Sequence, residues 1–304
     1  MSNREWKKYA VGPSEKSGGS LNVDCRFFDT ISHTSHAGLA MGIIANNEIR
    51  PSLIFDKSKL NKDRILVSWL SPNSWSGVGY RYGNVQFVFP FSGLIKGKQF
   101  YWVEAIDYKI PACRILITDQ DRSNSLDVYD PRERSGPWWH DAATGRHYFN
   151  GNHCIEFMFE SIIPLDDLTS ITFVAHHNKY CSIHPNNPSK CSEFGVGREA
   201  GGAKFLANAV ISGISIKEYE RFFDDDDIAG ALNRYTLDVT RNVSHVPDPP
   251  ACNTQALSRA ALAAYFYDRV DDAKGIASLF PDKRSFDDAV FALVEEALGR
   301  SVNR

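Results

Sequence analysis

Two histidines and a distant glutamate are the residues of this chain whose types and placement could do chemistry. His33 and His36 stand in the stretch SHTSH, between a strand-like run over 25–32 and a helix-like run over 36–49. Such histidines can pack in a core, hold a metal ion or line a ligand pocket. Glu156 stands in the apolar run CIEFMF. Burying a carboxylate is costly unless it is paired, so strand alternation predicts that Glu156 faces solvent or a cleft.

The surroundings of these residues resemble a known family. The order of strand, His-Thr-Ser-His, amphipathic helix, turn and second strand resembles the first motif of the ADP-ribosyltransferase superfamily. SHTSH is similar to the His-x-Thr-His opening of its DarT-like toxins, which modify nucleic acid, and NNEIRP resembles the turn after the helix. The run CIEFMFESIIPLDDL resembles the strand and acidic helix start around the catalytic glutamate of that group. The resemblance covers residues 25–176 in outline and implies NAD as the substrate.

The resemblance implies a role for each motif residue. His33, with Ser35 and His36 beside it, would bind NAD, and His33 would bond a ribose hydroxyl. Glu156 would be the catalytic residue, with Glu160 as its nearest competitor on the same face of the strand. A carboxylate at the 2′-hydroxyl of the nicotinamide ribose stabilises the oxocarbenium-like centre and helps to deprotonate the acceptor.

The middle motif of the family, between the first histidine motif and the catalytic glutamate, has only an approximate match in this sequence. The family places an aromatic residue against nicotinamide. The stretch 64–84 offers Trp69, Trp75, Tyr80 and Tyr82, of which Trp69 and Tyr82 are the candidates for NAD binding. Arg64, with Arg50 as the alternative, is the candidate for an arginine on the pyrophosphate, a contact that guanidinium groups make well. This stretch departs from the DarT pattern. The competing interpretation is that Trp69 is a core residue and that RYGN forms a β-turn.

The region before Glu156 interleaves cationic and aromatic residues. A loop is expected here, and its candidates for contact with the acceptor are Trp138, Trp139, Arg146 and His147. Cations with aromatic rings suit phosphate contact and base stacking, although a lid over the core would use the same residues. The prediction is transfer of ADP-ribose to RNA or single-stranded DNA, as in toxins of the CmdT type from bacterial anti-phage toxin–antitoxin systems. A protein acceptor, or an RNA 2′-phosphotransferase of the same fold, is the alternative.

A run rich in histidine and cysteine spans residues 176–191. It holds five side chains of the types that zinc prefers: His176, His177, Cys181, His184 and Cys191. The last four are weak zinc candidates, and His176 and His177 could instead line the cleft after the Glu156 strand. There is no C-x-x-C pair, so the expectation is a polar loop without a metal ion. A zinc-stabilised binding module without catalysis is the alternative from another class. The deaminase signature, the G-x-S-x-G motif and the glycine-rich phosphate loops are absent from the sequence.

Bulk composition narrows the class of protein. The chain has 304 residues, 43% of them apolar, and a formal net charge of −3. A nucleic acid would therefore have to be held by a local patch rather than by a global basic field. The six cysteines are too sparse for a disulfide scaffold. No apolar run reaches the ~20 residues of a membrane span, and the N-terminus does not look like a signal peptide, so a cytoplasmic protein without membrane contact is expected.

The expected fold class is α+β: a mixed or antiparallel split β-sheet core of the ADP-ribosyltransferase kind, with flanking helices. Residues 1–20 are expected to be a flexible lead-in, 21–220 the main domain, and 221–304 a linker with a C-terminal helical region. Apolar runs with β-branched and aromatic residues predict strands over 25–32, 64–72, 84–91, 100–108, 113–119, 154–164 and 167–176.

Helices are expected mainly near the C-terminus. Residues 201–222 combine a helical start with the strand-like AVISGISI. Two helices are predicted over 254–299, the second with Ser285 as its N-cap. An apolar repeat at every fourth position marks the buried face of that second helix: Phe286, Val290, Val294 and Leu298. Binding of an antitoxin or chaperone is one hypothesis for this tail, and packing on the main domain is the other.

Overall fold

The chain folds as a mixed α+β protein composed of two compact units, each built from several chain segments. The structure is a computed structural model, and it describes residues 4–11, 25–54, 57–72, 82–107, 111–176, 184, 186–246 and 253–304. Unit 1 comprises Met1–His33, Glu48–Ser76 and Val88–Asp167, and unit 2 comprises Thr34–Asn47, Gly77–Phe87 and Leu168–Arg304. The units do not divide at the expected boundary near residue 220.

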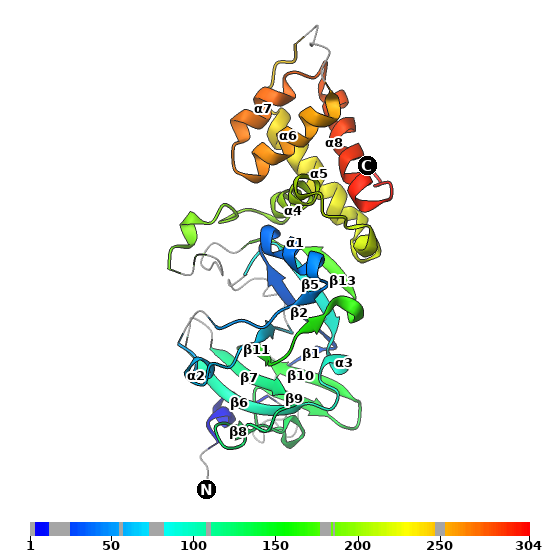
Figure 1. The fold of residues 1–304 in the computed structure, drawn as a ribbon. Helices are drawn as coiled ribbons and strands as arrows, with labels where there is room; N and C mark the ends of the chain where they lie inside the picture. Colours follow the sequence, from blue (N-terminus) through cyan, green and yellow to red (C-terminus); the bar gives the residue numbers. More distant parts are fainter. Residues whose placement is uncertain are drawn as a thin grey trace. The chain divides into compact units, whose positions relative to one another are not determined.

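Unit 1 is built around a five-stranded sheet. Its strand order is β4-β11-β7-β6-β8, and Figure 1 shows β11, β7 and β6 side by side. β11 runs antiparallel to β4 and parallel to β7, while β6 runs antiparallel to both β7 and β8. The strands are β4 (Ser68–Leu70), β6 (Gln99–Ile106), β7 (Ala112–Thr118), β8 (Asp127–Val128) and β11 (Cys154–Phe159).

The central strands β7 and β11 are buried at every position, which explains their nearly continuous apolar sequence. Met158 and Leu116 belong to an apolar cluster that also includes Leu60 and Ile65. Leu60 comes from α2 (Lys59–Lys62). Phe157, which precedes Met158 in β11, faces the other way and packs against the rings of Phe28, Phe91 and Trp138. The sheet therefore has an apolar layer on both faces.

A second, three-stranded sheet of unit 1 replaces the expected acceptor loop. Its order is β1-β10-β9, and all neighbours are antiparallel. Its strands are β1 (Cys25–Phe28), β9 (Trp138–Asp141) and β10 (Arg146–Asn150). Gly145 closes the β9–β10 hairpin with a φ of +69°, a conformation that glycine adopts readily. The sequence did not predict this hairpin because its paired segments, WWHD and RHYF, mix polar and aromatic side chains and lack the regular alternation typical of strands.

Short elements complete unit 1. β3 (Glu48–Ile49) pairs with β12 (Ile163–Pro164), and α3 is Phe91–Leu94. The expected flexible lead-in is wrong for residues 4–11: a 3-10 helix (Glu5–Tyr9) buries Trp6 and Tyr9, and both rings lie about 6 Å from that of Trp102.

β2 (Thr30–Ser35) and β5 (Val85–Pro90) each begin in one unit and end in the other, and they form a sheet with β13 (Ser170–Phe173) in the order β13-β5-β2. α1 (Ala37–Asn46) follows β2, as predicted. Asn47 ends this helix in the left-handed region, with a φ of +55°, which asparagine tolerates better than most residues.

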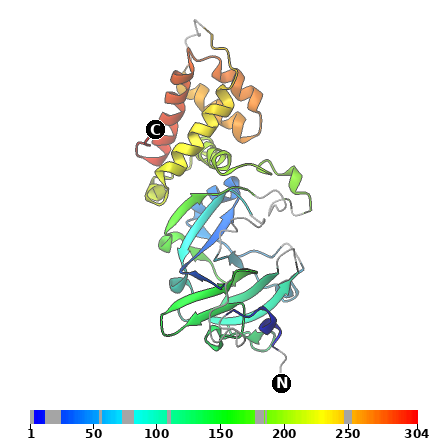
Figure 2. The same cartoon turned by 180° about the vertical axis from the view of Figure 1, so that it is seen from behind.

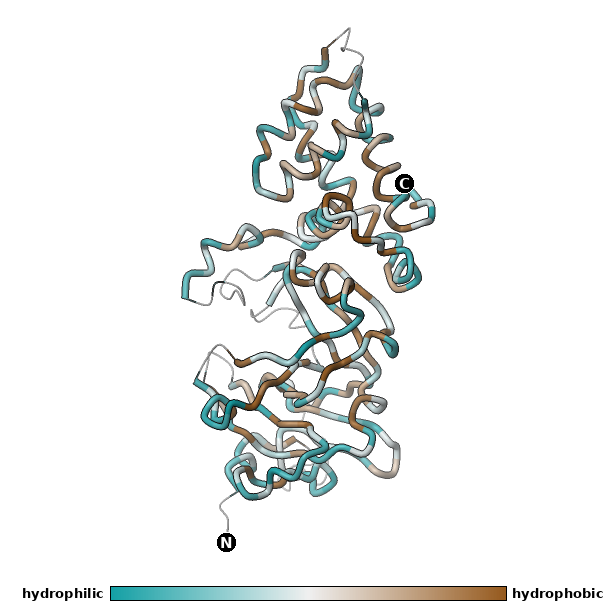
Figure 3. The backbone as a smooth tube through the Cα atoms, in the orientation of Figure 1, coloured by the Kyte–Doolittle hydropathy of each residue, from teal (hydrophilic) through white to brown (hydrophobic). Residues whose placement is uncertain are grey.

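Unit 2 is mainly helical, and Figure 2 shows its C-terminal helices from behind. α4 packs against α1, α5, α6 and α8. Figure 3 shows teal and brown stretches alternating along these helices, as amphipathic sequences do. The helices are α4 (Arg198–Ser212), α5 (Asp225–Thr240), α6 (Thr254–Phe266), α7 (Val270–Ala277) and α8 (Lys283–Leu298).

Three expectations about this region are corrected and one is confirmed. Most of the strand-like AVISGISI lies in α4 or in the turn after it, because packing on three sides stabilises the helix over its β-branched residues. Three helices rather than two occupy 254–299. Asp282, not Ser285, caps α8 by accepting a bond from the Ser285 backbone N–H. The apolar repeat of α8 is buried, as expected.

Candidate functional site

His33 lies in β2 and is fixed by Trp69 of β4. Its Nδ1 is 3.0 Å from the Trp69 carbonyl oxygen, and the two ring centroids are 5.9 Å apart. A carbonyl only accepts, so Nδ1 carries the proton and Nε2 of the neutral ring is an acceptor. Burial lowers the pKa of His33, and the Trp69 carbonyl partly opposes that shift. The ring is therefore neutral at pH 7, and its Nε2 is able to accept a bond from a hydroxyl.

Glu156 is part of a row of charges across three neighbouring strands. Glu156, Arg114 and Glu104 stand in register on β11, β7 and β6. Arg114 Nε donates to Glu156 Oε2 at 2.8 Å, and Arg114 Nη1 lies 3.4 Å from Glu104 Oε1. Glu156 is 2% exposed and Arg114 is 3% exposed. The arginine thus offsets the cost of burying the carboxylate. In the sequence, this arginine is visible only as a single cation in the strand run CRILIT.

Two buried thiols border the Glu156 pair. Burial raises the pKa of Cys154, and the negative charge of Glu156 adds to that effect. The pKa of Cys113 is raised for the same two reasons, with burial the larger. Both thiols stay protonated at neutral pH, so neither is a nucleophile.

The structure brings His33, Trp69 and Glu156 into one region of unit 1. Ser32 bridges to Ser71 just beyond β4, and Leu70 pairs with Phe157 of β11. At this point the end of β4 therefore lies between Ser32 and β11, although β2 itself belongs to the sheet β13-β5-β2. Trp69 is half-buried and also packs on the apolar cluster, which agrees with part of the core interpretation.

The other predicted NAD-binding residues have structural contacts of their own. Ser35 and His36 belong to unit 2. The Ser35 carbonyl accepts a bond from the Asn84 N–H at 3.0 Å. Gly83, next to the half-buried Tyr82, approaches so closely that an added Cβ would stand 2.0 Å from the Ser35 carbonyl carbon. Arg64 is an exposed turn residue with a φ of +55°, directly after α2.

The predicted acceptor contacts are largely structural side chains. Trp138 is 0% exposed, Trp139 3% and His147 6%. The indole Nε1 of Trp138 donates to His147 Nδ1 at 3.3 Å. Trp138 is therefore a core residue and does not present a face for base stacking, which corrects that expectation. Arg146 is exposed, with its guanidinium 5.1 Å from the ring centre of Phe27.

A pocket of about 600 Å³ lies over the buried pair of Trp138 and His147. Both residues contribute to its wall. Its rim carries several cationic or titratable side chains, which are Lys96, Lys98, Arg132 and His140. Asp130 also lines the pocket and pairs with Arg132 at 2.8 Å. Lys98 pairs with Asp119 at 3.0 Å, so carboxylates offset two of the three cations of this rim. The pocket is polar, and its lysine and arginine side chains could contact a phosphate group.

The histidine and cysteine run contributes two residues, His176 and Cys191, to a cluster within the described part of the chain. His177 and Cys181 lie outside the described residues, and His184 is half-buried. Cys191 lies with His36 and His176, and the ligand atoms of these three residues are all within 4.8 Å of one another. Spacing alone did not reveal this group because His36 comes from a distant part of the sequence.

Within the described residues, no helix is both long and apolar enough to cross a lipid bilayer. Comparison with known proteins found no matching family model, no matching curated protein and no matching solved structure.

Proposed function

We propose that the protein is an NAD-dependent mono-ADP-ribosyltransferase that modifies a nucleic acid. The observation that supports this most is the proximity of the two motif residues in unit 1. At Ser32, the end of β4 lies between β2, which carries His33, and β11, which carries Glu156. Adjacent strands are about 4.8 Å apart, so the two backbones are roughly 10 Å apart. That separation suits two side chains that hold different parts of one dinucleotide.

Each group would have a distinct role in the reaction. The neutral His33 would accept a bond from a ribose hydroxyl and position the dinucleotide. The C–N bond to nicotinamide breaks, and its electron pair leaves with the nicotinamide. Glu156, which is paired with Arg114, would stabilise the oxocarbenium-like ribosyl centre. The acceptor then forms a bond to that carbon and gives up its proton. Trp69 beside His33 is the candidate ring for nicotinamide.

The site must open when NAD binds. Glu156 is 2% exposed, so a ribose hydroxyl reaches it only after neighbouring side chains move. Loop or lid motion of this kind is common in enzymes and often limits their rate. The proposal therefore includes a closed, NAD-free state in which the carboxylate is held by its arginine.

A nucleic acid is the proposed acceptor because the sequence resembles DarT-like toxins, which modify nucleic acid. The pocket lined by Lys96, Lys98 and Arg132 lies on the Phe157 side of the sheet, opposite Glu156, so it would bind phosphate groups of the acceptor away from the reacting ribose. Phosphate groups bind such cations. RNA and single-stranded DNA expose the base and ribose atoms that a transferase must reach. Activity as a toxin in phage defence, with an antitoxin as partner, is the role that this chemistry would serve.

The test is transfer of label from radiolabelled NAD to separate pools of RNA, single-stranded DNA and total protein. Wild type should label one nucleic acid pool and release nicotinamide. Glu156→Gln and His33→Ala should each reduce labelling by at least about 10²-fold, since each removes a positioned catalytic or binding group. Labelling of the protein pool alone would reject the acceptor, and no turnover in any pool would reject the enzyme.

Glu160→Gln is the matched control. Glu160 follows directly after β11 and forms an ion pair with Arg122, so the substitution also removes one paired carboxylate near the same strand. It should leave labelling close to that of wild type. Thermal unfolding of all variants separates loss of chemistry from loss of fold.

A non-catalytic binding module is the second candidate function. The row Glu104–Arg114–Glu156 favours it, because a buried ion pair across neighbouring strands can hold the sheet together without any role in catalysis. On this alternative, Glu156→Gln lowers stability while wild type consumes no NAD. An RNA 2′-phosphotransferase of the same fold would instead consume NAD only with 2′-phosphorylated RNA.

A further inference from the structure

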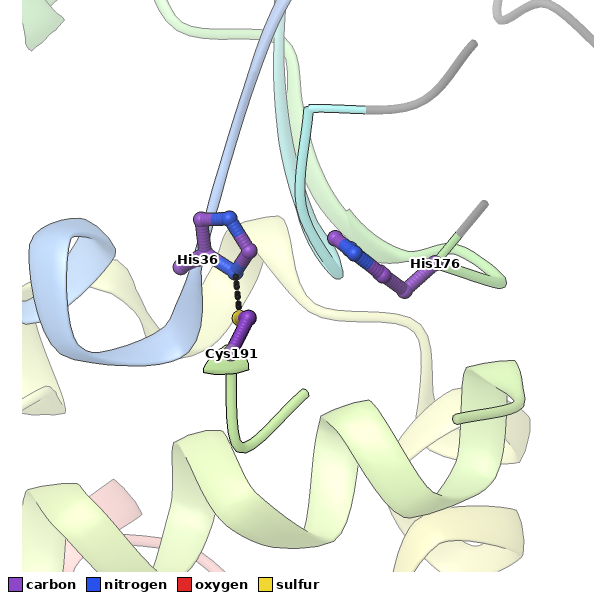
Figure 4. Close-up of side chains that lie close together, drawn as sticks. All are labelled: His36, His176 and Cys191. Carbon is purple, nitrogen blue, oxygen red and sulfur yellow. Dashed lines mark hydrogen bonds between the residues drawn. The ribbon is translucent and has the colours of Figure 1, made fainter. Parts of the chain in front are cut away.

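A buried cluster in unit 2 combines three side chains of the types that bind transition metals. His36 precedes α1, His176 follows β13, and Cys191 follows the 3-10 helix Pro188–Lys190. They are 1%, 5% and 7% exposed, respectively. Figure 4 shows the three side chains directed toward one another. From these residues, together with Glu193, we infer that unit 2 binds a zinc ion.

The distances suit a tetrahedral site. Zinc lies about 2.0–2.3 Å from nitrogen and sulfur ligands, so two ligands of one tetrahedral ion are roughly 3.3–3.8 Å apart. His36 Nδ1 and Cys191 Sγ are 3.6 Å apart. All three ligand atoms of the cluster lie within 4.8 Å of one another, and the rings of His36 and His176 are 4.9 Å apart between centroids. A small inward shift of the His176 ring completes three positions.

Glu193 is the carboxylate proposed for the fourth position. It lies beside His36 but outside the group of three mutually close ligand atoms, so it would have to rotate toward the ion. Its Oε2 is 3.1 Å from His36 Nδ1, while its Oε1 accepts the backbone N–H of Ala37 at 3.0 Å. Oε2 is also 3.3 Å from the Ala37 N–H, so the carboxylate holds both the start of α1 and the His36 ring. The charges also balance: a thiolate and a carboxylate together neutralise Zn²⁺. A neutral site is the kind that tolerates burial, and Glu193 is 4% exposed.

The segment that carries two of these ligands is held in place. Lys204 of α4 is 3% exposed, and its Nζ donates to the carbonyl of Ser192 at 2.6 Å. The backbone N–H of His176 donates to the Val196 carbonyl at 3.1 Å. These bonds fix the chain on both sides of the site, which lowers the entropy lost when an ion binds.

The types of ligand indicate which ion would bind and what it would do. Thiolate and imidazole with one carboxylate favour Zn²⁺ over the harder cations Mg²⁺ and Ca²⁺. The site is closed and its ligands come from three separate elements, so the ion would be structural. It would tie the start of α1 to the end of β13 and to the segment before α4. This assignment gives His36 a role as a metal ligand in place of the NAD contact expected from the sequence.

The test is metal analysis of the full-length protein produced with zinc in the medium and dialysed extensively. Wild type should hold one zinc ion per chain. Cys191→Ser and His176→Asn should each retain zinc at least about tenfold less well. Cys25→Ser, which alters a half-buried thiol of β1 in unit 1, is the matched control and should bind zinc like wild type.

A second measurement covers the case in which a variant does not fold. Wild type loaded with Co²⁺ should show a thiolate-to-cobalt charge-transfer band and the strong visible bands of a tetrahedral site. A strong chelator should remove the zinc and lower the unfolding temperature. Wild type that binds no zinc and no Co²⁺, or variants that all keep their zinc, would overturn the inference.

Discussion

At the scale of single residues, the environment of His147 makes stability depend on pH. Its Nδ1 accepts a bond from the Trp138 indole, so protonation of that nitrogen would break the bond. Burial, with a smaller contribution from His140, lowers the pKa of His147 from 6.5 to about 4. The unfolded chain therefore binds a proton at a higher pH than the folded chain, and stability is lost as the pH falls from 6.5 toward 4.

Replacing His147 by Gln should remove this pH dependence. The amide still offers an acceptor to Trp138 but does not titrate. We expect the free energy of unfolding of wild type to fall by about 2 kcal/mol more between pH 7 and pH 4 than that of His147→Gln, after allowance for solvent screening. Urea unfolding at both pH values measures it. Equal losses in the two proteins would contradict the burial argument.

Arg114 should matter more to stability than any exposed cation. Arg114→Met leaves two carboxylates of the row, Glu104 and Glu156, without their arginine. Removing one partner of a buried pair costs about 3–5 kcal/mol. Arg122→Met is the matched control, because the Arg122–Glu160 pair is partly exposed and such pairs contribute about 0–1 kcal/mol. Denaturant midpoints of the two variants at pH 7 give the comparison, and similar losses would show that burial is not decisive.

At the scale of elements, α4 contains two adjacent glycines because its neighbours approach closely. A Cβ added at Gly201 would lie 2.4 Å from Asn84 Cβ. A Cβ at Gly202 would lie 2.6 Å from the Phe173 ring and 2.9 Å from Ala231 Cβ. Glycine costs about 1 kcal/mol per position in a helix relative to alanine. Close packing of α4 against β13 and α5 offsets that cost.

Gly202→Ala should therefore destabilise the protein although alanine is the better helix former. Overpacking costs about 1–3 kcal/mol. Gly275→Ala in α7 is the control, because nothing lies within 4 Å of its added Cβ, and it should raise stability by about 0.5–1 kcal/mol. Thermal or urea unfolding of both variants tests the sign. Stabilisation by both would show that α4 has room for a methyl group.

At the scale of the whole molecule, the two units are interleaved along the chain. Unit 2 takes in residues 34–47 and 77–87 as well as the segment from Leu168 onward. α1 buries Ala37, Ala40, Met41 and Ile44, and it packs on α4. A fragment that ends at Asp167 keeps α1 but loses α4. The apolar face of α1 is then exposed.

Truncation after Asp167 should give an aggregating protein rather than a folded half. Exposed apolar patches of this kind promote association. Expression of residues 1–167 beside the full chain, followed by gel filtration and dye binding to exposed apolar surface, tests this. A monodisperse fragment with a cooperative melt would show that unit 1 folds without the later helices.

By itself, the sequence determined the elements with the strongest local signals. Apolar, β-branched runs became β5, β6, β7 and β11, and the four-residue repeat became the buried face of α8, because period and composition act over a few neighbouring residues. Predictions from local sequence were wrong where tertiary packing determined the secondary structure. AVISGISI became helical against its propensity, and the expected loop around Trp138 became a hairpin.

Only the tertiary structure decided which distant side chains meet. Arg114 contacts Glu156 because of the register between β7 and β11. His36 lies beside His176, Cys191 and Glu193 because the segments that carry them pack around α4. Motifs in the sequence predicted roles for His33 and Glu156. They did not predict an ion-pair partner for Glu156, and they predicted an NAD contact for His36. The spacing of residues along the chain does not predict which distant side chains will be in contact. Register and packing of whole elements set these contacts, and a burial cost then requires each buried charge to have its counterpart.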